Sequence, residues 1–259
     1  MEAEEVEFAV ADGIARVTLN RPARRNALSA SMANALTAAW ERIDADASIG
    51  AVVLAAAPCG TFCAGMDLKE MAAVRAGGAD LLARIADPFQ ARLRTVQKPV
   101  VAALGGHFSG AGMLLAMGAD IRVGLAGSRA AISEARFGRG TAWAVPLLWM
   151  LPQAVLSEMV LTGAPVPVEE LWRHGFVNHL EPTPEAVLAR ACAVAAAIVR
   201  NAPLSVLAAK ATLAAGMDLG CAAGLVRGAE LHRAVYASAD AEEGPRAFAE
   251  GRPPVWQGR

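Results

Sequence analysis

Two short apolar runs, each followed by a glycine-containing turn, constrain the fold of this chain most strongly. Residues 51–56 (AVVLAA) follow Gly50, and residues 100–104 (VVAAL) follow Lys98-Pro99. Unbroken apolar runs of this length are typical of strands that are buried on both faces, as in parallel sheets covered by helices. The sequence therefore predicts an α/β fold with its sheet in the interior.

The N-terminal segment predicts a β-β-α unit. Residues 6–10 and 14–19 have the composition of strands, and the Asp-Gly pair between them is a strong hairpin signal. The segment 26–29 then leads into an amphipathic helix that ends near Ile43, with Ser29 as its N-cap.

The remaining elements alternate in the same manner before the chain becomes helical. Residues 121–124 predict a further strand, and residues 69–96 predict a loose helix followed by a firmer one, with 76–80 as a mobile loop. Helices are expected at 146–162, 167–174, 184–200, 203–217 and 220–237. Because no linker divides the chain, we expect one α/β domain with a helical C-terminal appendage.

Composition and charge argue against several classes of protein. The chain of 259 residues has 24 Lys and Arg against 25 Asp and Glu, so it offers no large positive field to nucleic acid or an anionic membrane. Its most apolar stretch, Val145–Leu161, contains Pro146 and Pro152 and is expected to be a buried helix instead of a membrane span. The acidic residues 1–5 do not resemble a leader, so a cytoplasmic location is expected.

Cysteine and histidine spacing favours neither disulfides nor a metal site. The four cysteines contain no C-x-x-C pair and are expected to be reduced thiols, and the four histidines have no ligand-type spacing. These residues are Cys59, Cys63, Cys192 and Cys221, and His107, His174, His179 and His232.

Two strand-turn-helix passages carry the candidate chemistry. They are residues 62–68 (FCAGMDL) and 105–112 (GGHFSGAG). Small residues let a ligand approach the backbone, and the first N–H groups of a following helix have no intrahelical partner. If the two turns converge, their N–H groups hold the oxygen of a thioester carbonyl as it becomes an enolate. Either passage alone is better explained as a tight turn, since glycine turns are common in α/β folds.

These segments resemble the enoyl-CoA hydratase/isomerase (crotonase) superfamily. The resemblance covers essentially the whole chain, because further similar segments occur in the same order. They are residues 20–28, 62–71, 98–103, 120–122, 159–163, 175–178 and 243–253.

The resemblance implies a fold, a substrate and a quaternary structure. Residues 1–200 would form a crotonase-type spiral of β-β-α units, and residues 201–259 would form a helical region that builds homotrimers or dimers of trimers. The substrate would be an acyl-CoA thioester, with no cofactor beyond the CoA that the substrate carries.

The resemblance also implies site residues. The backbone N–H groups of Met66 and Ala111 would form the oxyanion hole. The substrate and its CoA group would be bound by Arg24, Arg25, Ala27, Ala64, Met66, Asp67, Leu68, Lys69, Gly110, Leu114 and Trp143.

The acid–base positions indicate the reaction. Family hydratases use two glutamates; the first position is Leu114 in this chain and the second is Glu134. Water addition ordinarily divides its proton transfers between two groups, whereas a single base can move a double bond by taking a proton at C2 and returning it at C4. The pattern is thus similar to that of 3,2-enoyl-CoA isomerases. Apolar neighbours of Glu134 are expected to raise its pKa, and Trp143 is expected to shape the acyl pocket.

Three alternatives stay open at this stage. The protein could hydrate or dehydrate an enoyl-CoA, it could be a non-catalytic acyl-CoA-binding oligomer, or it could use the same oxyanion hole for decarboxylation. Glu134 itself could be a surface carboxylate that pairs with Arg136 or Arg139.

Overall fold

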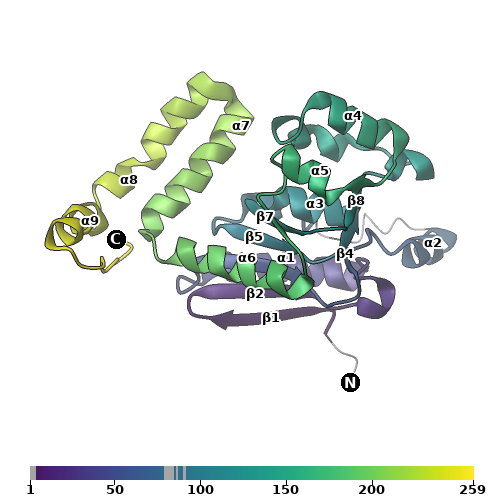
Figure 1. Cartoon of the computed structure of the whole chain (residues 1–259), viewed down its shortest axis with the longest axis horizontal. Coiled ribbons are helices and arrows are strands. Elements are labelled where there is room, and N and C mark those ends of the chain that lie inside the picture. The colour runs from purple at the N-terminus through teal and green to yellow at the C-terminus, as the bar shows by residue number, and fades with distance from the viewer. Residues whose placement is uncertain (1–3, 79–84, 86, 90–91) are drawn as a thin grey trace.

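The computed structural model describes residues 4–78, 85, 87–89 and 92–259. Its larger sheet has the strand order β1-β2-β3-β5-β7-β10 (Figure 1). β1 pairs with β2 in the antiparallel sense, and the other neighbouring strands are parallel. The strands are β1 (Val6–Ala11), β2 (Ile14–Leu19), β3 (Ala51–Ala56), β5 (Val100–Leu104), β7 (Ile121–Leu125) and β10 (His179–Glu181).

A smaller sheet with the order β4-β6-β8-β9 gives the fold its repeat. In the chain β4 follows β3, β6 follows β5 and β8 follows β7, so each turn of the spiral adds one strand to each sheet. These strands are β4 (Thr61–Cys63), β6 (His107–Ser109), β8 (Arg129–Ala131) and β9 (Val166–Pro167). The predicted α/β spiral is confirmed, but strands of two or three residues are too short for a period-two pattern, and sequence reasoning missed them.

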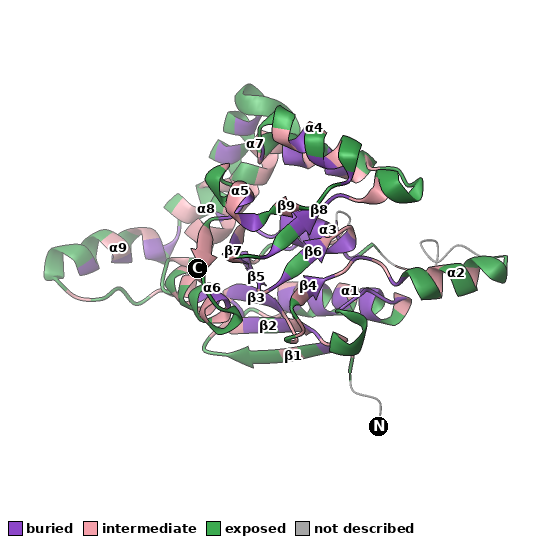
Figure 2. Ribbon diagram, turned by 45° about the vertical axis from the view of Figure 1, so that its right-hand side comes forward, coloured by how far each residue is buried: buried purple, intermediate pink, exposed green. Residues whose placement is uncertain are grey.

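The central strands are buried on both faces, as their composition predicts. Val52 and Leu54 of β3 point into a core shared with α1 (Ala30–Ala45), α3 (Ala111–Gly118) and the smaller sheet. Ala51 and Val53 point into a second core, against α6 (Pro184–Val199). Figure 2 shows these strands as the buried centre of the molecule.

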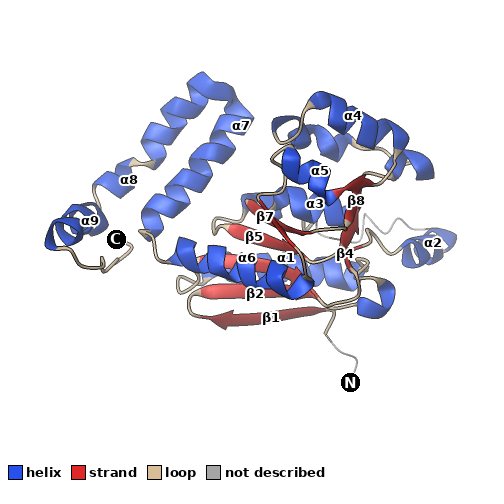
Figure 3. Cartoon of the chain, viewed as in Figure 1, coloured by secondary structure: helices blue, strands red, loops and turns tan. Residues whose placement is uncertain are grey.

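Two helices that cover the large sheet, α1 and α6, begin at capping side chains, those of Ser29 and Thr183. The hydroxyl of Ser29 accepts the N–H of Met32 at 3.0 Å, at the start of the helix that packs on β1 and β2. Figure 3 shows the helices around both sheets. Those not bounded elsewhere are α2 (Leu68–Ala76), α5 (Val168–Arg173), and the short 3-10 helices η1 (Pro22–Arg24), η3 (Leu93–Thr95) and η4 (Glu134–Phe137).

The prediction of one buried helix over 146–162 is wrong. The structure has a 3-10 helix, η5 (Ala142–Trp149), and then α4 (Gln153–Thr162), separated at Pro152. Proline has no N–H to donate and ends regular hydrogen bonding at that point. The stretch is also largely exposed, since Val145, Trp149 and Leu161 keep 55%, 61% and 78% of their accessible surface.

The region 69–96 is less regular than its prediction. α2 ends at Ala76, and residues Gly77 and Gly78 form a turn. The second predicted helix falls partly outside the described residues, as do positions 79 and 80 of the predicted mobile loop.

The C-terminal region begins with a helical hairpin. α7 (Pro203–Leu231) contains one non-helical residue, Gly220, and continues into α8 (Arg233–Tyr236). A methyl group on Gly224 would lie 2.8 Å from the Cα of Gly216, so the two limbs pack antiparallel about the bend. The predicted break between residues 217 and 220 is therefore confirmed.

The length of each limb of this hairpin can be compared with the length that a membrane span needs. The stretch Pro203–Tyr236 is long and apolar enough for a span by length and composition. Since it folds back at Gly220, each limb is shorter than the roughly 20 residues that a span requires.

The last helix, α9 (Ala239–Glu250), was not predicted as a helix. It contains Gly244 and Pro245, both of which argue against helix by propensity. The helix forms because the hydroxyl of Ser238 caps it and the Glu243 carboxylate accepts hydrogen bonds from Arg252 and from the backbone of Val255.

A close approach between α3 and β4 makes Gly112 sensitive to substitution. A methyl group there would lie 2.4 Å from the carbonyl oxygen of Cys63, so one of the two elements must shift. We expect Gly112→Ala to lower the free energy of unfolding by roughly 1–3 kcal/mol, measured by chemical denaturation. Gly216→Ala is the control, because a methyl group there meets nothing within 4 Å. Equal losses in the two variants would contradict the close packing.

Candidate active site

The first turn presents an N–H group that the fold does not use. Leu28 forms an isolated parallel bridge with Met66, in which the Leu28 N–H donates to Gly65 O and the Asp67 N–H donates to Leu28 O, both at 2.8 Å. In this pattern the N–H of the central residue points away from its partner. Within the described chain, no hydrogen bond is found for the Met66 N–H.

The second turn presents another N–H group close to the first, that of Ala111, and it too has no hydrogen bond to the described residues. Ala111 is the first residue of α3, where the N–H has no intrahelical partner. Gly110 before it has φ of 52°, a left-handed value that favours glycine. A methyl group on Gly65 would lie 3.8 Å from the Ala111 nitrogen, which shows how closely the turns meet.

Glu134 adds a carboxylate to the same place. A methyl group on Gly110 would lie 3.5 Å from Oε1 of Glu134 and 3.7 Å from the Gly65 Cα. Its Oε2 is buried and has no hydrogen-bond partner among the described residues. Burial raises the pKa of Glu134, while hydrogen bonds from its own backbone, the Trp143 side chain and the Ser133 backbone oppose the shift. The predicted direction of the pKa shift agrees with the structure.

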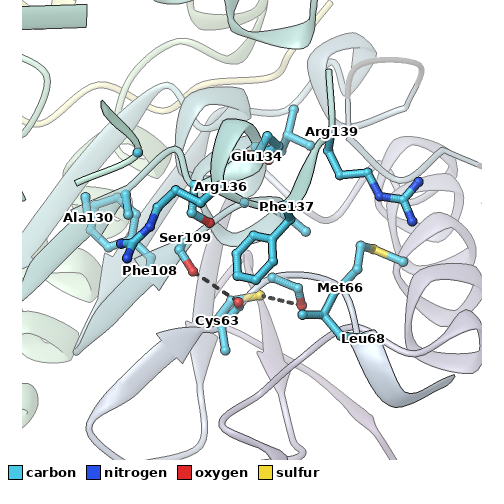
Figure 4. Close-up of a pocket in the computed structure, with 18 of the residues that line it drawn as sticks. Cys63, Met66, Leu68, Phe108, Ser109, Ala130, Glu134, Arg136, Phe137 and Arg139 are labelled. Atoms are coloured by element: carbon cyan, nitrogen blue, oxygen red, sulfur yellow. Dashed lines mark hydrogen bonds between the residues drawn. The ribbon is translucent and has the colours of Figure 1, made fainter. Parts of the chain in front are cut away.

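A cavity of about 1220 Å³ surrounds these groups. Figure 4 shows Glu134 above it and Met66 and Leu68 along its side. The predicted site residues that line it are Arg25, Ala64, Met66, Leu68, Gly110, Ala111, Leu114, Glu134 and Trp143. Segments from separate turns of the spiral therefore meet at one cavity.

Four predicted substrate-binding residues lie outside the lining. Arg24 and Lys69 are exposed. Ala27 is buried, and its carbonyl accepts a hydrogen bond from Arg21 at 2.6 Å. Asp67 caps α2 by accepting the N–H groups of Lys69 and Glu70, and it pairs with Arg21 at 3.1 Å. Contact between these four residues and substrate stays a prediction.

A buried asparagine that sequence reasoning passed over holds the first turn in place. Asn26 is fully buried, and its amide donates to Ala57 O and Thr61 O, both at 2.9 Å. It also accepts the N–H of Arg21 at 3.0 Å. Its neighbour Arg25 accepts the N–H of Ala64, so this network fixes the strand that leads to Met66. Asn26 lies in a segment that carries the resemblance, but single-sequence reasoning gives its side chain no role.

Other polar side chains near the cavity have local roles. Burial raises the pKa of Cys63 to about 12, which keeps it a thiol at neutral pH. The Ser109 hydroxyl donates to Ala64 O at 3.0 Å (Figure 4). The Nδ1 of His107 accepts the backbone N–H of Arg129 at 2.9 Å, and its ring lines the cavity.

The alternative of a surface ion pair for Glu134 is not supported by the structure. Neither Arg136 nor Arg139 pairs with it in the described part of the chain. Figure 4 shows the two guanidinium groups pointing to opposite sides of the cavity. Both arginines line the cavity, and sequence reasoning did not assign them to the site.

The fold defines the class of this protein. A crystal structure of an enoyl-CoA hydratase from Mycobacterium tuberculosis H37Rv superimposes with a TM-score of 0.89 at 33% identity, covering 99% of this chain and 100% of that chain. The α/β spiral is therefore the crotonase fold.

Sequence comparison identifies the family. Residues 9–259 match the family described as Enoyl-CoA hydratase/isomerase. The chain is 36% identical to enoyl-CoA hydratase EchA19 of Mycobacterium tuberculosis, over 94% of this chain and 92% of that protein. It is 32% identical to (E)-benzylidenesuccinyl-CoA hydratase of Thauera aromatica, over 98% and 99% of the two chains. The chain belongs to the enoyl-CoA hydratase/isomerase family of enzymes.

Proposed function

We propose that this enzyme isomerises the double bond of an enoyl-CoA through a thioester enolate, with Glu134 as its single acid–base group. One observation carries the proposal: two backbone N–H groups that have no partner among the described residues, those of Met66 and Ala111, meet beside one half-buried carboxylate with a raised pKa. The thioester supplies the only CoA required, and no separate cofactor enters the reaction.

The geometry supports a two-step proton transfer. Glu134 removes a proton from C2 of a 3-enoyl thioester, and the electron pair moves toward the carbonyl oxygen. The N–H groups of Met66 and Ala111 stabilise this oxyanion, and the dipole of α3 adds to the field. Glu134 then returns the proton at C4, so that the double bond moves from the 3,4 to the 2,3 position and no atom is gained or lost.

The lining of the cavity favours a single acid–base group. Leu114, at the position of a hydratase glutamate, lines the cavity and cannot transfer a proton. Among the described lining residues, only Glu134 and Asp87 carry carboxylates. The Oδ1 of Asp87 accepts the N–H of Phe89 at 2.8 Å. Asp87 is exposed, whereas Glu134 lies against the turn that carries Ala111.

Hydration is the second candidate, and the relatives favour it. Both curated proteins described above are named as hydratases. For this chain, hydration requires that Glu134 activate a water molecule and that a group other than residue 114 assist the proton transfer to carbon.

Product mass distinguishes these reactions. We expect the enzyme to convert a 3-enoyl-CoA into a product of unchanged mass with a new chromatographic retention, because isomerisation only moves a proton. Water addition to a 2-enoyl-CoA would instead add about 18 Da and would make hydration the main activity. Absence of both products, together with tight acyl-CoA binding, would support the non-catalytic alternative.

The raised pKa of Glu134 predicts the pH dependence of turnover. The base form must be ionised, so kcat/KM rises with pH through the pKa of Glu134. Because burial raises that pKa, the acidic limb is expected above the ordinary glutamate value of about 4.3. The measurement is kcat/KM for a 3-enoyl-CoA against pH at constant ionic strength. An acidic limb at or below the ordinary value would contradict the assignment.

We also propose a homotrimer or a dimer of trimers in which residues 201–259 mediate association. Support comes from large apolar side chains that the single chain leaves exposed on α7, α8 and α9: Leu213, Leu219, Leu225, Val226, Tyr236 and Phe248. Burying such surface is favourable, and patches of this kind mark interaction sites. A cytoplasmic location and the absence of nucleic-acid and membrane partners remain part of the proposal.

A further inference from the structure

We infer that His107, Arg129 and Arg136 form a binding site for an oxyanion of the substrate, at the end of the cavity formed by the smaller sheet. The oxyanion is a carboxylate or phosphate oxygen. This inference rests on the proposed function, because it assigns the anion to the same acyl-CoA that reacts at Glu134.

Strand pairing brings the first two residues together. Phe108 of β6 pairs with Ala130 of β8, which places their preceding residues, His107 and Arg129, side by side. The Arg129 N–H donates to Nδ1 of His107 at 2.9 Å. A ring nitrogen that accepts a hydrogen bond carries no proton, so in the neutral ring Nε2 carries it and serves as a donor. Both residues line the cavity.

Arg136 reaches the same end from η4. Its aliphatic stem packs on Gly163, where a methyl group would lie 2.6 Å from Cγ and 2.7 Å from Cδ. Figure 4 shows its guanidinium group near Ala130, on the opposite side of the cavity from Arg139. The glycine thus leaves room for the stem of Arg136 to run toward β8.

Neither guanidinium group is neutralised by the described protein. Arg129 and Arg136 form no ion pair there, and Nη1 of Arg129 donates only to the carbonyl of Pro165, at 3.2 Å. Arg129 has a weak electrostatic interaction with Glu169 and helps to lower the pKa of that carboxyl. The main cause of the lowered pKa is the N–H of Gly127, from which Oε1 of Glu169 accepts a hydrogen bond at 2.6 Å.

This arrangement suits an anion more than a neutral ligand. Two like charges on one wall repel each other, and an oxyanion between them relieves that repulsion. Guanidinium groups bind carboxylate and phosphate oxygens through paired donors, and the His107 Nε2–H can add a further one. Two parts of an acyl-CoA carry such oxygens: a carboxylate on the acyl group, or the phosphates of the nucleotide.

Binding measurements with three thioesters test the site and identify the source of the anion. The ligands are a saturated methyl-ended acyl-CoA, a carboxylate-ended acyl-CoA of equal length, and the methyl-ended acyl thioester of pantetheine, which lacks phosphate. They are titrated into the wild type, the Arg129→Gln/Arg136→Gln double variant, and Arg190→Gln. Arg190 lies on α6 outside the cavity lining and pairs there with Glu181 at 2.9 Å, so it is the matched control.

The double variant is expected to lose affinity by about 10- to 100-fold, as the loss of charge-assisted hydrogen bonds implies. A loss confined to the carboxylate-ended thioester identifies the acyl group as the source. Equal losses for both CoA thioesters, without a loss for the pantetheine thioester, identify the nucleotide phosphates.

Two results overturn the inference and are distinguishable. If the wild type binds and converts acyl-CoA while the double variant binds all three ligands as Arg190→Gln does, the anion site is wrong and the proposed function stands. If the wild type neither binds nor converts any thioester, the proposed function fails and the anion site fails with it.

Discussion

Glu134→Gln is expected to lower kcat for double-bond migration by roughly 10²- to 10⁴-fold, the range of general acid–base catalysis. The amide keeps the size of the side chain but cannot take a proton from C2. Because the proposal assigns the thioester oxygen to the backbone N–H groups of Met66 and Ala111, which this substitution leaves in place, acyl-CoA binding is expected to persist. Steady-state turnover of a 3-enoyl-CoA and direct titration of a saturated acyl-CoA measure the two quantities.

Glu134→Gln is also expected to change stability in a known direction, so a loss of turnover can be distinguished from a loss of folding. The pKa of Glu134 is raised in the folded state, so its ionised form destabilises the fold at pH values above that pKa. Replacing the carboxylate with a neutral amide removes this penalty, and Glu134→Gln should unfold at a temperature no lower than that of the wild type at neutral pH. As the pH falls through the raised pKa, the difference should shrink.

Glu158→Gln is the matched control, because it makes the same substitution on the exposed surface of α4. It should leave both kcat and stability unchanged. If Glu134→Gln and Glu158→Gln turned over substrate equally well, Glu134 could not be the base, and the proposed isomerisation would be wrong.

The central strands of the large sheet could be predicted from the sequence because they are apolar on both faces, whereas its edge strand β10 has only three residues and was not predicted. Residues 51–56 and 100–104 carry that signal by themselves, and Ser29 carries the signal for a helix start. The smaller sheet could not be predicted, because β4, β6 and β8 have three residues each and pair only with strands distant in the chain. α9 was hidden by Gly244 and Pro245, whose propensities are outweighed by contacts with the C-terminal tail.

Part of the candidate site could likewise be predicted from the sequence, and part could not. Met66, Ala111 and Glu134 were assigned through family segments, and each lies beside the cavity. The clustering of Arg129 and Arg136 could not be predicted, since it depends on the pairing of β6 with β8 and on the space above Gly163. The order of residues along the chain shows neither that β6 pairs with β8 nor that Gly163 leaves space for the Arg136 side chain.

Ala111→Pro is expected to lower kcat/KM by about 10²- to 10³-fold, which is the effect of losing one oxyanion-hole donor. Proline removes the N–H that the proposal assigns to the thioester oxygen. It is also tolerated at the first residue of a helix, where that N–H has no intrahelical partner and φ near −65° is already suitable. Ala111 holds this position in α3, so the fold should survive the substitution. Circular dichroism and thermal unfolding check that it does.

Ala111→Gly separates the donor from the side chain. Glycine removes the methyl group but keeps the N–H, so its turnover should stay within about tenfold of the wild type if the backbone donor provides the stabilisation. Proline also fills part of the space where the carbonyl oxygen would lie, so kcat and acyl-CoA affinity are both measured for each variant. If folded Ala111→Pro were as active as Ala111→Gly, the thioester oxygen would have to be held elsewhere. The meeting of the two turns would then have no part in the chemistry.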